Sequence, residues 1–348
     1  MHSFDYRFLS GAVPAGLSGA TSVLFDLRAR NALRMKADEG LFEKLREAAI
    51  IESVRGSNAI EGIVTTKSRL REIMQNQATP ATHGEREILG YRNALQEIYD
   101  PGSAASFTEE YVRHLHALLL QTTSDQAGSY KREDNWIQER DSSGRISVRF
   151  VPVSARETPD AMGQLVMAYR EARQDSIINP LALSACVVVD FLCIHPFADG
   201  NGRVSRLITA MLLQQSGFDI GRYVSVEGMV DSHKAGYYDA LKASSEGWHE
   251  NENDYSPFIL YLLQILYACY KELDLRYANE STKRMPKAKQ VEALLMSTYA
   301  PISKAEVCER LPEISATTVE RALGNLVKAG IIEKMGTYRD ARYRKVSQ

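Results

Sequence analysis

The stretch NPLALSACVVVDFLCIHPFADGNGRVSR, residues 179–206, decides the fold of this chain. Asn179 and Pro180 are the residue types that cap an α-helix and open its first turn. The following residues up to Ile194 are apolar on every side, which predicts a helix buried at the centre of a domain. A second helix is expected from Val204 to Gln215, where Gly217 stops it. The polar loop between the two helices is the candidate for chemistry.

That loop contains a base, a metal ligand and a turn suited to anions. His195 closes the buried helix, and a histidine with its usual pKa near 6.5 is the natural general base at neutral pH. Asp199 offers the hard oxygen that Mg²⁺ accepts alongside phosphates. The glycines of the 200–202 segment let backbone N–H groups approach an anion at the start of the next helix.

Two arginines follow at three-residue spacing. Arg203 and Arg206 project from one face of the helix that starts here. Cations at a helix N-terminus oppose the macrodipole, so their presence needs another reason, and a polyphosphate supplies it. Each feature alone is more often a cap or a turn. Together within twelve residues they predict a phosphoryl- or nucleotidyl-transfer site.

The segment resembles the signature of the Fic family, H-x-F-x-(D/E)-G-N-G-R-x-x-R, and matches it at every specified position. The resemblance extends over roughly Phe107 to Gly217. It implies a mainly α fold, a Fic-type helical bundle with a β-hairpin flap. It also implies a protein adenylyltransferase, a nucleotidyltransferase that moves AMP from ATP to a Tyr, Thr or Ser hydroxyl.

The resemblance assigns a role to each motif residue. His195 deprotonates the target hydroxyl, Phe197 anchors the loop, and Asp199 holds Mg²⁺ against the α- and β-phosphates. The β-phosphate region is reached by Arg203 and the γ-phosphate by Arg206. The anion hole consists of Gly200, Asn201 and Gly202. In the family's kinase-like branch a lysine occupies the last of these positions, so glycine favours AMP transfer.

A second motif lies upstream. SNAIEG, residues 57–62, resembles the family's inhibitory motif (S/T)-x-x-x-E-(G/N), with Ser57, Glu61 and Gly62 at the specified positions. It reads as a short helical piece, around residues 55–62, that Gly62 ends from a left-handed conformation. Its resemblance implies that Glu61 pairs with Arg206 and so occupies the arginine that should hold the γ-phosphate.

The residues around the core predict further elements. Thr108 is a candidate N-cap for a helix from Tyr111 to Leu120, and helical periodicity also covers 84–99, 158–173, 237–245 and 255–275. Between Tyr130 and Pro152, apolar strands flank a polar turn at 141–144, which predicts a β-hairpin. This hairpin resembles the family's flap, which registers a target segment by strand addition. A plain surface excursion is the alternative.

Beyond about Tyr277 the composition changes. ANESTKRMPK, residues 278–287, is expected to be a linker. Helices at 287–299, 303–310 and 315–330, then a hairpin, predict a C-terminal winged helix-turn-helix. Its basic residues are Lys328, Lys334, Arg339, Arg342, Arg344 and Lys345. Winged helices bind DNA or dock proteins, and both alternatives stay open. The expected domains are 1–105, a helical region with the inhibitory helix; 106–280, the catalytic core; and 281–348.

Composition limits the classes of binding partner and the cellular location that we expect. Lys and Arg total 42 against 44 for Asp and Glu, so the net charge of −2 gives no general attraction to nucleic acid or to acidic membranes. The four cysteines form no C-x-x-C pair, and free thiols are expected. The N-terminus lacks a secretory pattern, so a cytoplasmic protein is expected.

Two other functions fit the same residues. The first is a nucleotide-sensing, DNA-binding regulator, and the second is removal of AMP from modified proteins with Glu61 activating water. Partners implied by the resemblance are ATP, an unidentified target protein and a second copy of the chain, with auto-AMPylation. The sequence does not exclude UTP or GTP as the nucleotide.

Overall fold

The computed structural model describes residues 2–11, 15–103, 105–140, 144–284, 286–298, 300–337 and 341–346. The chain divides into two compact units, Met1–Leu273 and Asp274–Gln348. Residues 1–105 belong to the same unit as the expected catalytic core, so the N-terminal helices and the core form one packed body. Each unit is described by itself.

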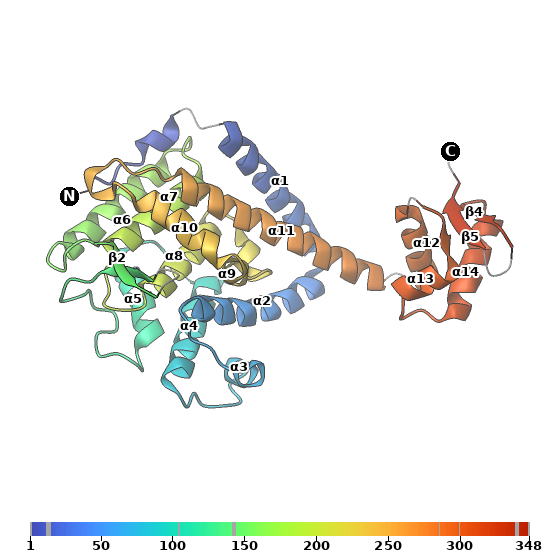
Figure 1. The fold of residues 1–348 in the computed structure, drawn as a ribbon, viewed down its shortest axis with the longest axis horizontal. Coiled ribbons are helices and arrows are strands. Elements are labelled where there is room, and N and C mark those ends of the chain that lie inside the picture. The colour runs from blue at the N-terminus through green and yellow to red at the C-terminus, as the bar shows by residue number, and fades with distance from the viewer. Residues whose placement is uncertain are drawn as a thin grey trace. The chain divides into compact units, whose positions relative to one another are not determined.

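The described residues of the first unit form helices and one hairpin (Figure 1). Its helices are α1 (Ala15–Ala37), α2 (Glu39–Ile60), α3 (Lys67–Met74), α4 (His83–Tyr99), α5 (Glu109–Leu120), α6 (Thr158–Gln174), α7 (Pro180–Ile194), α8 (Asn201–Gln215), α9 (Val226–Ser232) and α10 (Lys234–Ser245). Helix α11 (Ser256–Arg284) begins in this unit and continues past its last residue, Leu273. Short 3₁₀ turns cover Arg7–Ser10, Asp219–Arg222 and Trp248–Glu250.

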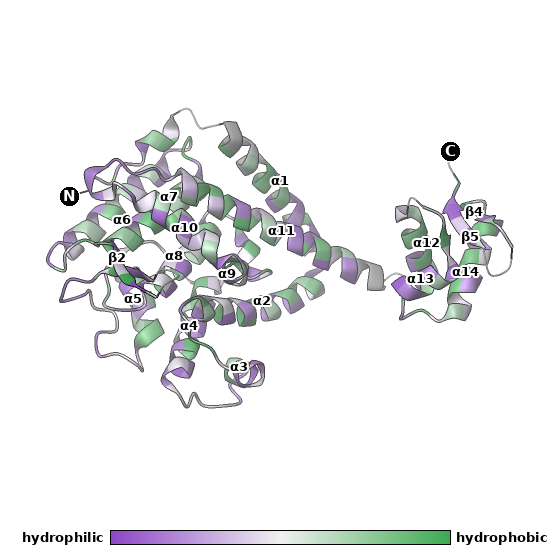
Figure 2. Cartoon of the chain, in the orientation of Figure 1, coloured by the Kyte–Doolittle hydropathy of each residue, from purple (hydrophilic) through white to green (hydrophobic). Residues whose placement is uncertain are grey.

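Helix α7 is the buried centre, as its sequence predicts. The Asn179 side chain accepts hydrogen bonds from the N–H groups of Leu181, at 2.9 Å, and Ala182, at 3.3 Å, and Pro180 occupies the first turn. Nearly all of its side chains are buried, and it packs against α6 and α8. Figure 2 shows that the helices of the bundle carry both hydrophobic and hydrophilic residues. The helix therefore carries the loop that follows it on a rigid base.

Helix α2 differs from the prediction. The inhibitory motif is not a separate short helix but the last turn of a 22-residue helix that runs through Gly40 and Gly56. At Gly56 the helix packs so closely on α9 that there is no room for a side chain: a Cβ would lie 2.7 Å from the backbone nitrogen of Gly228. Glycine is therefore accommodated within the helix. The predicted end is confirmed, since Gly62 has φ +79°.

The expected hairpin is present. Strands β1 (Ile137–Arg140) and β2 (Ile146–Phe150) pair antiparallel, with an irregularity between Ile137 and Gln138. The turn residues Asp141, Ser142 and Ser143 lie outside the described residues. The base of the hairpin is attached to the helical body, because Phe150 stacks on His249 and the His249 ring contacts the Val151 carbonyl at 2.8 Å.

The expected linker is partly helical. Helix α11 continues through Arg284, so residues 278–284 extend it and do not form the predicted linker. The second unit then contains α12 (Lys287–Ser297), β3 (Ile302–Ser303), α13 (Lys304–Arg310), α14 (Ala316–Lys328), β4 (Ile332–Met335) and β5 (Arg342–Lys345). Strand order is β3-β5-β4, all antiparallel. Strand β3 was not predicted, because two residues carry no alternation signal.

The second unit has its own apolar core, built around Val291, Val307, Val319 and Leu323. Arg339, one of the basic residues noted in the sequence, lies outside the described residues. All four cysteines of the chain are free thiols, and Cys186, Cys193 and Cys269 are buried. Within the described ranges, no helix is both long enough and apolar enough to span a bilayer.

Candidate active site

His195 terminates α7 in a left-handed conformation, with φ +51°. Its Nδ1 lies 3.2 Å from the Leu192 carbonyl oxygen, which can only accept, so Nδ1 carries the proton and Nε2 holds the free lone pair. Burial, together with the nearby charge of Lys131, lowers the pKa of His195 to about 4. The ring is therefore neutral at physiological pH, as a general base must be.

The loop after His195 is held by side chains from three directions. Asn201 accepts from the Phe197 N–H at 2.9 Å and donates to the Phe197 carbonyl at 2.7 Å. Asn135 donates to the same carbonyl at 3.1 Å. Lys131 donates to Asn135 Oδ1 at 2.8 Å and to the Ile194 carbonyl at 3.2 Å. The Asn201 side chain is thus used within the loop, which leaves its backbone N–H for an anion.

Phe197 and His116 form the floor of the loop. Phe197 is fully buried, and its ring stacks on that of His116 with centroids 3.8 Å apart. The Gly128 N–H donates to His116 Nδ1, so His116 Nε2 donates to the Asp199 carbonyl at 3.2 Å. Burial lowers the pKa of His116 to about 4, which keeps it in this neutral form.

Asp199 and Gly200 place a carboxylate at the start of α8. Gly200 is the left-handed N-cap, with φ +80°, and α8 starts at Asn201, three residues earlier than predicted. Asp199 Oδ1 accepts from the Gly200 N–H at 2.6 Å, while the side chain remains 74% exposed. No group of three His, Cys, Asp or Glu side chains within the described residues could hold a metal alone. A single open carboxylate fits Mg²⁺ that arrives with a phosphate-bearing substrate.

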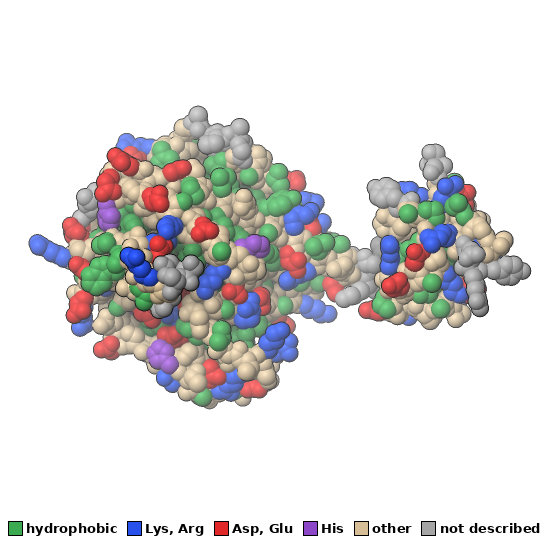
Figure 3. Space-filling view, in the orientation of Figure 1, with side chains coloured by type: hydrophobic (Ala, Val, Ile, Leu, Met, Phe, Trp, Pro, Cys, Tyr) green, Lys and Arg blue, Asp and Glu red, His purple; other side chains and the backbone are tan. Residues whose placement is uncertain are grey.

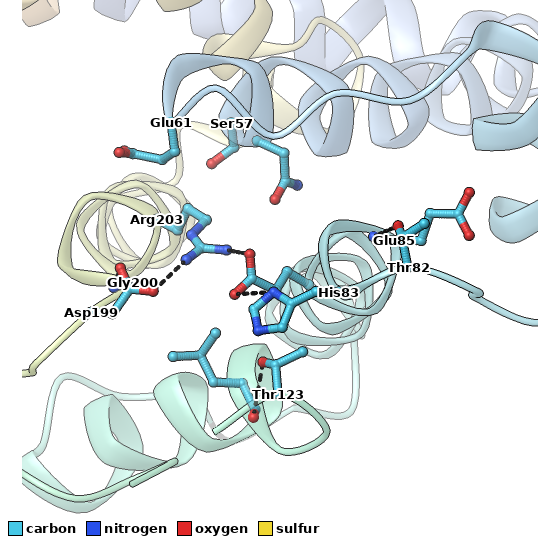
Figure 4. Close-up of polar contacts among 12 residues, drawn as sticks. Ser57, Glu61, Thr82, His83, Glu85, Thr123, Asp199, Gly200 and Arg203 are labelled. Carbon is cyan, nitrogen blue, oxygen red and sulfur yellow. Dashed lines mark hydrogen bonds and ion pairs between the residues drawn. The ribbon is translucent and has the colours of Figure 1, made fainter. Parts of the chain in front are cut away.

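Arg203 is fixed by a carboxylate from α4. Its Nη1 donates to Glu87 Oε2 at 2.9 Å, and both side chains are buried, 3% and 5% exposed. Its Nη2 lies 3.5 Å from Asp199 Oδ2. Figure 4 shows Arg203 pointing away from Ser57 and Glu61, toward Asp199 and the helix that carries His83. The His83 ring lies 3.6 Å from the other oxygen of Glu87.

Arg206 meets the end of α2. Its Nε donates to Ser57 Oγ at 2.8 Å, and its Nη2 donates to the Ser57 carbonyl at 3.0 Å and to Glu61 Oε1 at 2.7 Å. Glu61 also covers Gly202, because a Cβ on that glycine would collide with the carboxylate. The upstream motif and the loop, 145 residues apart in the chain, are therefore in direct contact.

These residues surround a cavity of about 450 Å³. Every site residue predicted from the loop lines it, together with Glu61; Ser57 lies behind Arg206 and Gly62 outside the lining. The lining predicted from the loop comprises His195, Asp199, Gly200, Asn201, Gly202, Arg203 and Arg206. Phe150 of the hairpin and Tyr238 of α10 form part of the wall.

The sequence did not reveal several supporting residues. Glu87, Lys131 and Asn135 lie in segments with no recognisable motif, and their importance comes only from the loop that they touch in space. Tyr237 and Tyr238 carry no chemical pattern either, and burial raises the pKa of Tyr238 to about 12. A buried charged residue on a helix face, such as Glu87, is the one signal that could have been noticed.

Comparison with known proteins gives a consistent result. Residues 106–213 match the Fic/DOC family. The Protein adenylyltransferase Fic of Culex quinquefasciatus is 33% identical over 231 residues, 65% of this chain and 41% of that protein. The Nematostella vectensis protein of the same name is 25% identical over 223 residues, 62% of this chain and 46% of that protein. The chain thus spans less than half of either relative.

Solved structures agree on the fold. A Fic family protein from Desulfovibrio desulfuricans G20 superposes with a TM-score of 0.64 at 20% identity, covering 97% of this chain and 98% of the other. A Fic domain containing signaling protein from Bacteroides thetaiotaomicron superposes with a TM-score of 0.57 at 21% identity, covering 75% and 98%. At these identities the likeness concerns the fold alone.

Proposed function

Because residues 106–213 are a domain of the Fic/DOC family, we propose that this protein transfers AMP from ATP to a hydroxyl of a protein. One observation supports the proposal most strongly. The free Nε2 of a neutral His195, the Asp199 carboxylate, the N-terminus of α8 and Arg206 all border one cavity. The names of the relatives, protein adenylyltransferases, support the same reaction.

In the proposed reaction the target hydroxyl oxygen attacks the α-phosphorus of ATP. The new P–O bond forms as the bond to the pyrophosphate oxygen breaks, and the hydroxyl proton passes to His195 Nε2. The backbone N–H groups of Asn201 and Gly202 at the start of α8 stabilise charge on the phosphates. Arg206 orients the terminal phosphate, and the rigid base of α7 fixes the distance between base and nucleotide.

Magnesium would be held by Asp199 together with the phosphates. When bound, the ion supplies charge neutralisation of the pyrophosphate that leaves. Arg203 limits the orientations of the Asp199 carboxylate through its 3.5 Å contact, and Glu87 holds Arg203 in turn. The open side chain of Asp199 is free to accept the ion as the substrate brings it.

Glu61 acts as a brake in this proposal. Its carboxylate occupies Arg206 and lies over Gly202, where the terminal phosphates would be placed. A charge-assisted bond with a buried arginine is specific and competes with phosphate for the same N–H groups. ATP would then bind with its α-phosphate out of line with His195. The brake is released when the Glu61 side chain turns away.

The target is proposed to be a Tyr, Thr or Ser hydroxyl presented in an extended segment. The outward side chains of β2, Ile146 and Val148, are about half exposed, and β1–β2 offers strand edges beside the cavity. A second copy of this chain is one candidate target, which would give auto-AMPylation.

The test is incubation of purified protein with α-³²P-ATP and Mg²⁺. Strong label on Glu61→Gly, weak label on wild type and none on Glu61→Gly/His195→Ala would support both the transfer and the brake. Absence of label from all three, while ATP binding is measured by calorimetry, would refute AMP transfer. Parallel reactions with UTP and GTP decide the nucleotide.

Two alternatives receive less support. A DNA-binding sensor needs free cations on the second unit, but Arg344 pairs with Glu333 and Lys304 with Glu320. Figure 3 shows acidic and basic side chains intermingled on the visible face of that unit. Removal of AMP by water activated at Glu61 requires the carboxylate that now binds Arg206. Loss of label from a premodified protein, faster with wild type than with Glu61→Gly, would favour it.

A further inference from the structure

Arg206 is held from behind by a buried chain of hydroxyl groups. Its Nε–H donates to Ser57 Oγ at 2.8 Å. Burial raises the pKa of Tyr91, and the neighbouring Ser57 hydroxyl opposes that rise as a donor. Tyr91 itself donates to Glu227 Oε1 at 3.1 Å. Ser57 and Tyr91 are fully buried, and Glu227 is 3% exposed. Glu61 takes no part in this network of hydroxyl groups.

The donors and acceptors fix the direction of the chain. An arginine only donates, so Ser57 Oγ is the acceptor of the first bond and retains its own proton. Tyr91 uses its proton on Glu227, so its oxygen is free to accept from Ser57. The order Arg206, Ser57, Tyr91, Glu227 is therefore a relay with one possible direction: a hydrogen bond at each end, the Ser57 and Tyr91 hydroxyls as neighbours between them, and a carboxylate as its last member.

The packing of α2 on α9 makes this relay possible. Gly56 has no side chain, and a Cβ would lie 2.8 Å from the Glu227 carbonyl carbon. Beside it, Ser53 donates to Ser225 Oγ at 3.0 Å, which joins the two helices through small residues. This close approach brings Glu227, in the first turn of α9, next to Tyr91 of α4.

Glu227 is also an unusual buried group. Its second oxygen, Oε2, has no hydrogen-bond partner among the described residues, and it borders a small cavity of about 30 Å³ that Arg206 also lines. That volume accommodates one water molecule. A buried carboxylate near a buried arginine lowers the energy of the positive charge even without direct contact. Glu227 is placed to do so whether Glu61 is bound or released.

We propose that Tyr91 and Glu227 are positioning residues for Arg206: through Ser57 they fix the guanidinium with its Nη groups facing the terminal phosphate of the nucleotide. The inference rests on the proposed function for the identity of the ligand. The relay explains how Arg206 keeps one orientation after Glu61 leaves, because the grip on Nε persists. It also means that α2 stays docked when the brake is released, and only the Glu61 side chain moves.

The test compares ATP with AMP, because only ATP carries the phosphate that Arg206 would bind. The parent is Glu61→Gly, and the variant adds Tyr91→Phe, which removes one oxygen and preserves the ring. Calorimetry should show ATP binding about three- to tenfold weaker in the variant, and AMP binding unchanged within about twofold. ATP affinity equal to that of the parent, or an equal loss for AMP, would overturn the proposal.

Tyr270→Phe in the same parent is the matched control. Tyr270 is equally buried, and its hydroxyl has no hydrogen-bond partner among the described residues. Its removal should leave both affinities and the melting temperature unchanged. A loss of ATP affinity in this control comparable to that of Tyr91→Phe would show that any buried hydroxyl matters, and would count against the relay.

A readout without nucleotide separates the relay from the proposed function. The Nε–H signal of Arg206 in a ¹⁵N spectrum, assigned with Arg206→Lys, should be protected from solvent exchange in the Glu61→Gly parent. Tyr91→Phe should broaden it or speed its exchange, and an unchanged signal refutes the relay. Failure of the parent to bind ATP would refute the proposed function alone.

Discussion

Two arginines one turn apart on α8 each meet a carboxylate, and the two contacts differ in kind. Glu87, in the middle of α4, grips Arg203 at 2.9 Å with 5% of its side chain exposed. Glu61, the residue after the last turn of α2, grips Arg206 at 2.7 Å with 32% exposed. The guanidinium groups are equally buried, so the carboxylates make the difference.

The comparison separates a permanent contact from a removable one. Glu87 lies in the middle of a helix, so its side chain cannot move away unless the helix moves. If it did, the buried Arg203 guanidinium would lose this carboxylate partner. Glu61 precedes a left-handed glycine at the helix end, where the side chain can reach solvent by rotating. A site can therefore use the same chemical pair as scaffold or as switch, depending on where along a helix the carboxylate is placed.

The largest effect is expected from breaking the permanent pair. Glu87→Gln leaves Arg203 buried without its countercharge and should lower the free energy of unfolding by about 3–5 kcal/mol. Glu61→Gln should cost less than about 1 kcal/mol, because that carboxylate is solvent-accessible and Ser57 still holds Arg206. Urea denaturation of both variants measures this, and equal losses would contradict the distinction.

The next effect concerns the removable pair. Glu61→Gly should raise labelling by α-³²P-ATP about ten- to a hundredfold, as expected from losing a charge-assisted bond of about 1.5–3 kcal/mol. Glu61→Gln should give a smaller rise, because its amide oxygen still accepts from Arg206. A rise in the glutamine variant as large as in the glycine variant would show that charge alone, and not the bond, sustains the proposed brake.

The part of the fold that depends on local sequence was predictable. Asn179 and Thr108 cap their helices as expected, since capping is a short-range interaction. The continuation of α2 through Gly56 was not, because glycine normally weakens a helix and here its value lies in contact with α9. Residues 278–284 were taken for a linker on composition, although polar residues are equally suited to an exposed helix.

The site residues that are contiguous in the sequence were predictable. Those that the fold brings in from distant segments were not. The loop from His195 to Arg206 and the Glu61 motif were found together, and the structure places them around one cavity. Glu87, Tyr91 and Glu227 were missed, because each has an ordinary sequence neighbourhood and its partner lies far along the chain: Glu87 contacts Arg203, 116 residues away, and Tyr91 contacts Glu227, 136 residues away. The roles in AMP transfer stay predictions until activity is measured.

A moderate effect is expected in the pH dependence. Burial lowers the pKa of His195 to about 4, so the base stays neutral and the labelling rate of Glu61→Gly should be flat from about pH 9 to 6, declining as pH approaches 4. Glu61 opposes this shift by its charge, so its removal moves the decline further down. An inflection near 6.5 would contradict the buried, neutral ring.

Melting temperatures over the same range provide the control. His195 and His116 both have lowered pKa values in the fold, so the unfolded chain binds more protons between pH 6.5 and 4. The stability that the two neutral histidines contribute is therefore fully present above about pH 6.5, and it is lost as the pH falls toward 4. Rates should be compared only where the protein remains folded.

The smallest effect is expected from the solvent-exposed ion pairs of the second unit. The side chains of two such pairs, Arg344 with Glu333 and Lys304 with Glu320, are 40–71% exposed, and exposed pairs contribute little to stability. They do compensate charge, so a filter-binding assay with random duplex DNA at low salt should detect no saturable retention. Tight, salt-sensitive retention would instead support the DNA-binding alternative.

The left-handed backbone of His195 has a consequence for laboratory evolution. A side chain with φ +51° is strained by roughly 1–2 kcal/mol, and glycine or asparagine would relieve it. A variant library selected for heat resistance alone should therefore accumulate those residues at position 195 and discard the imidazole. Selection for thermal stability would therefore remove the proposed general base first. The surviving variants would be stable and well folded but would lack the imidazole at the end of α7.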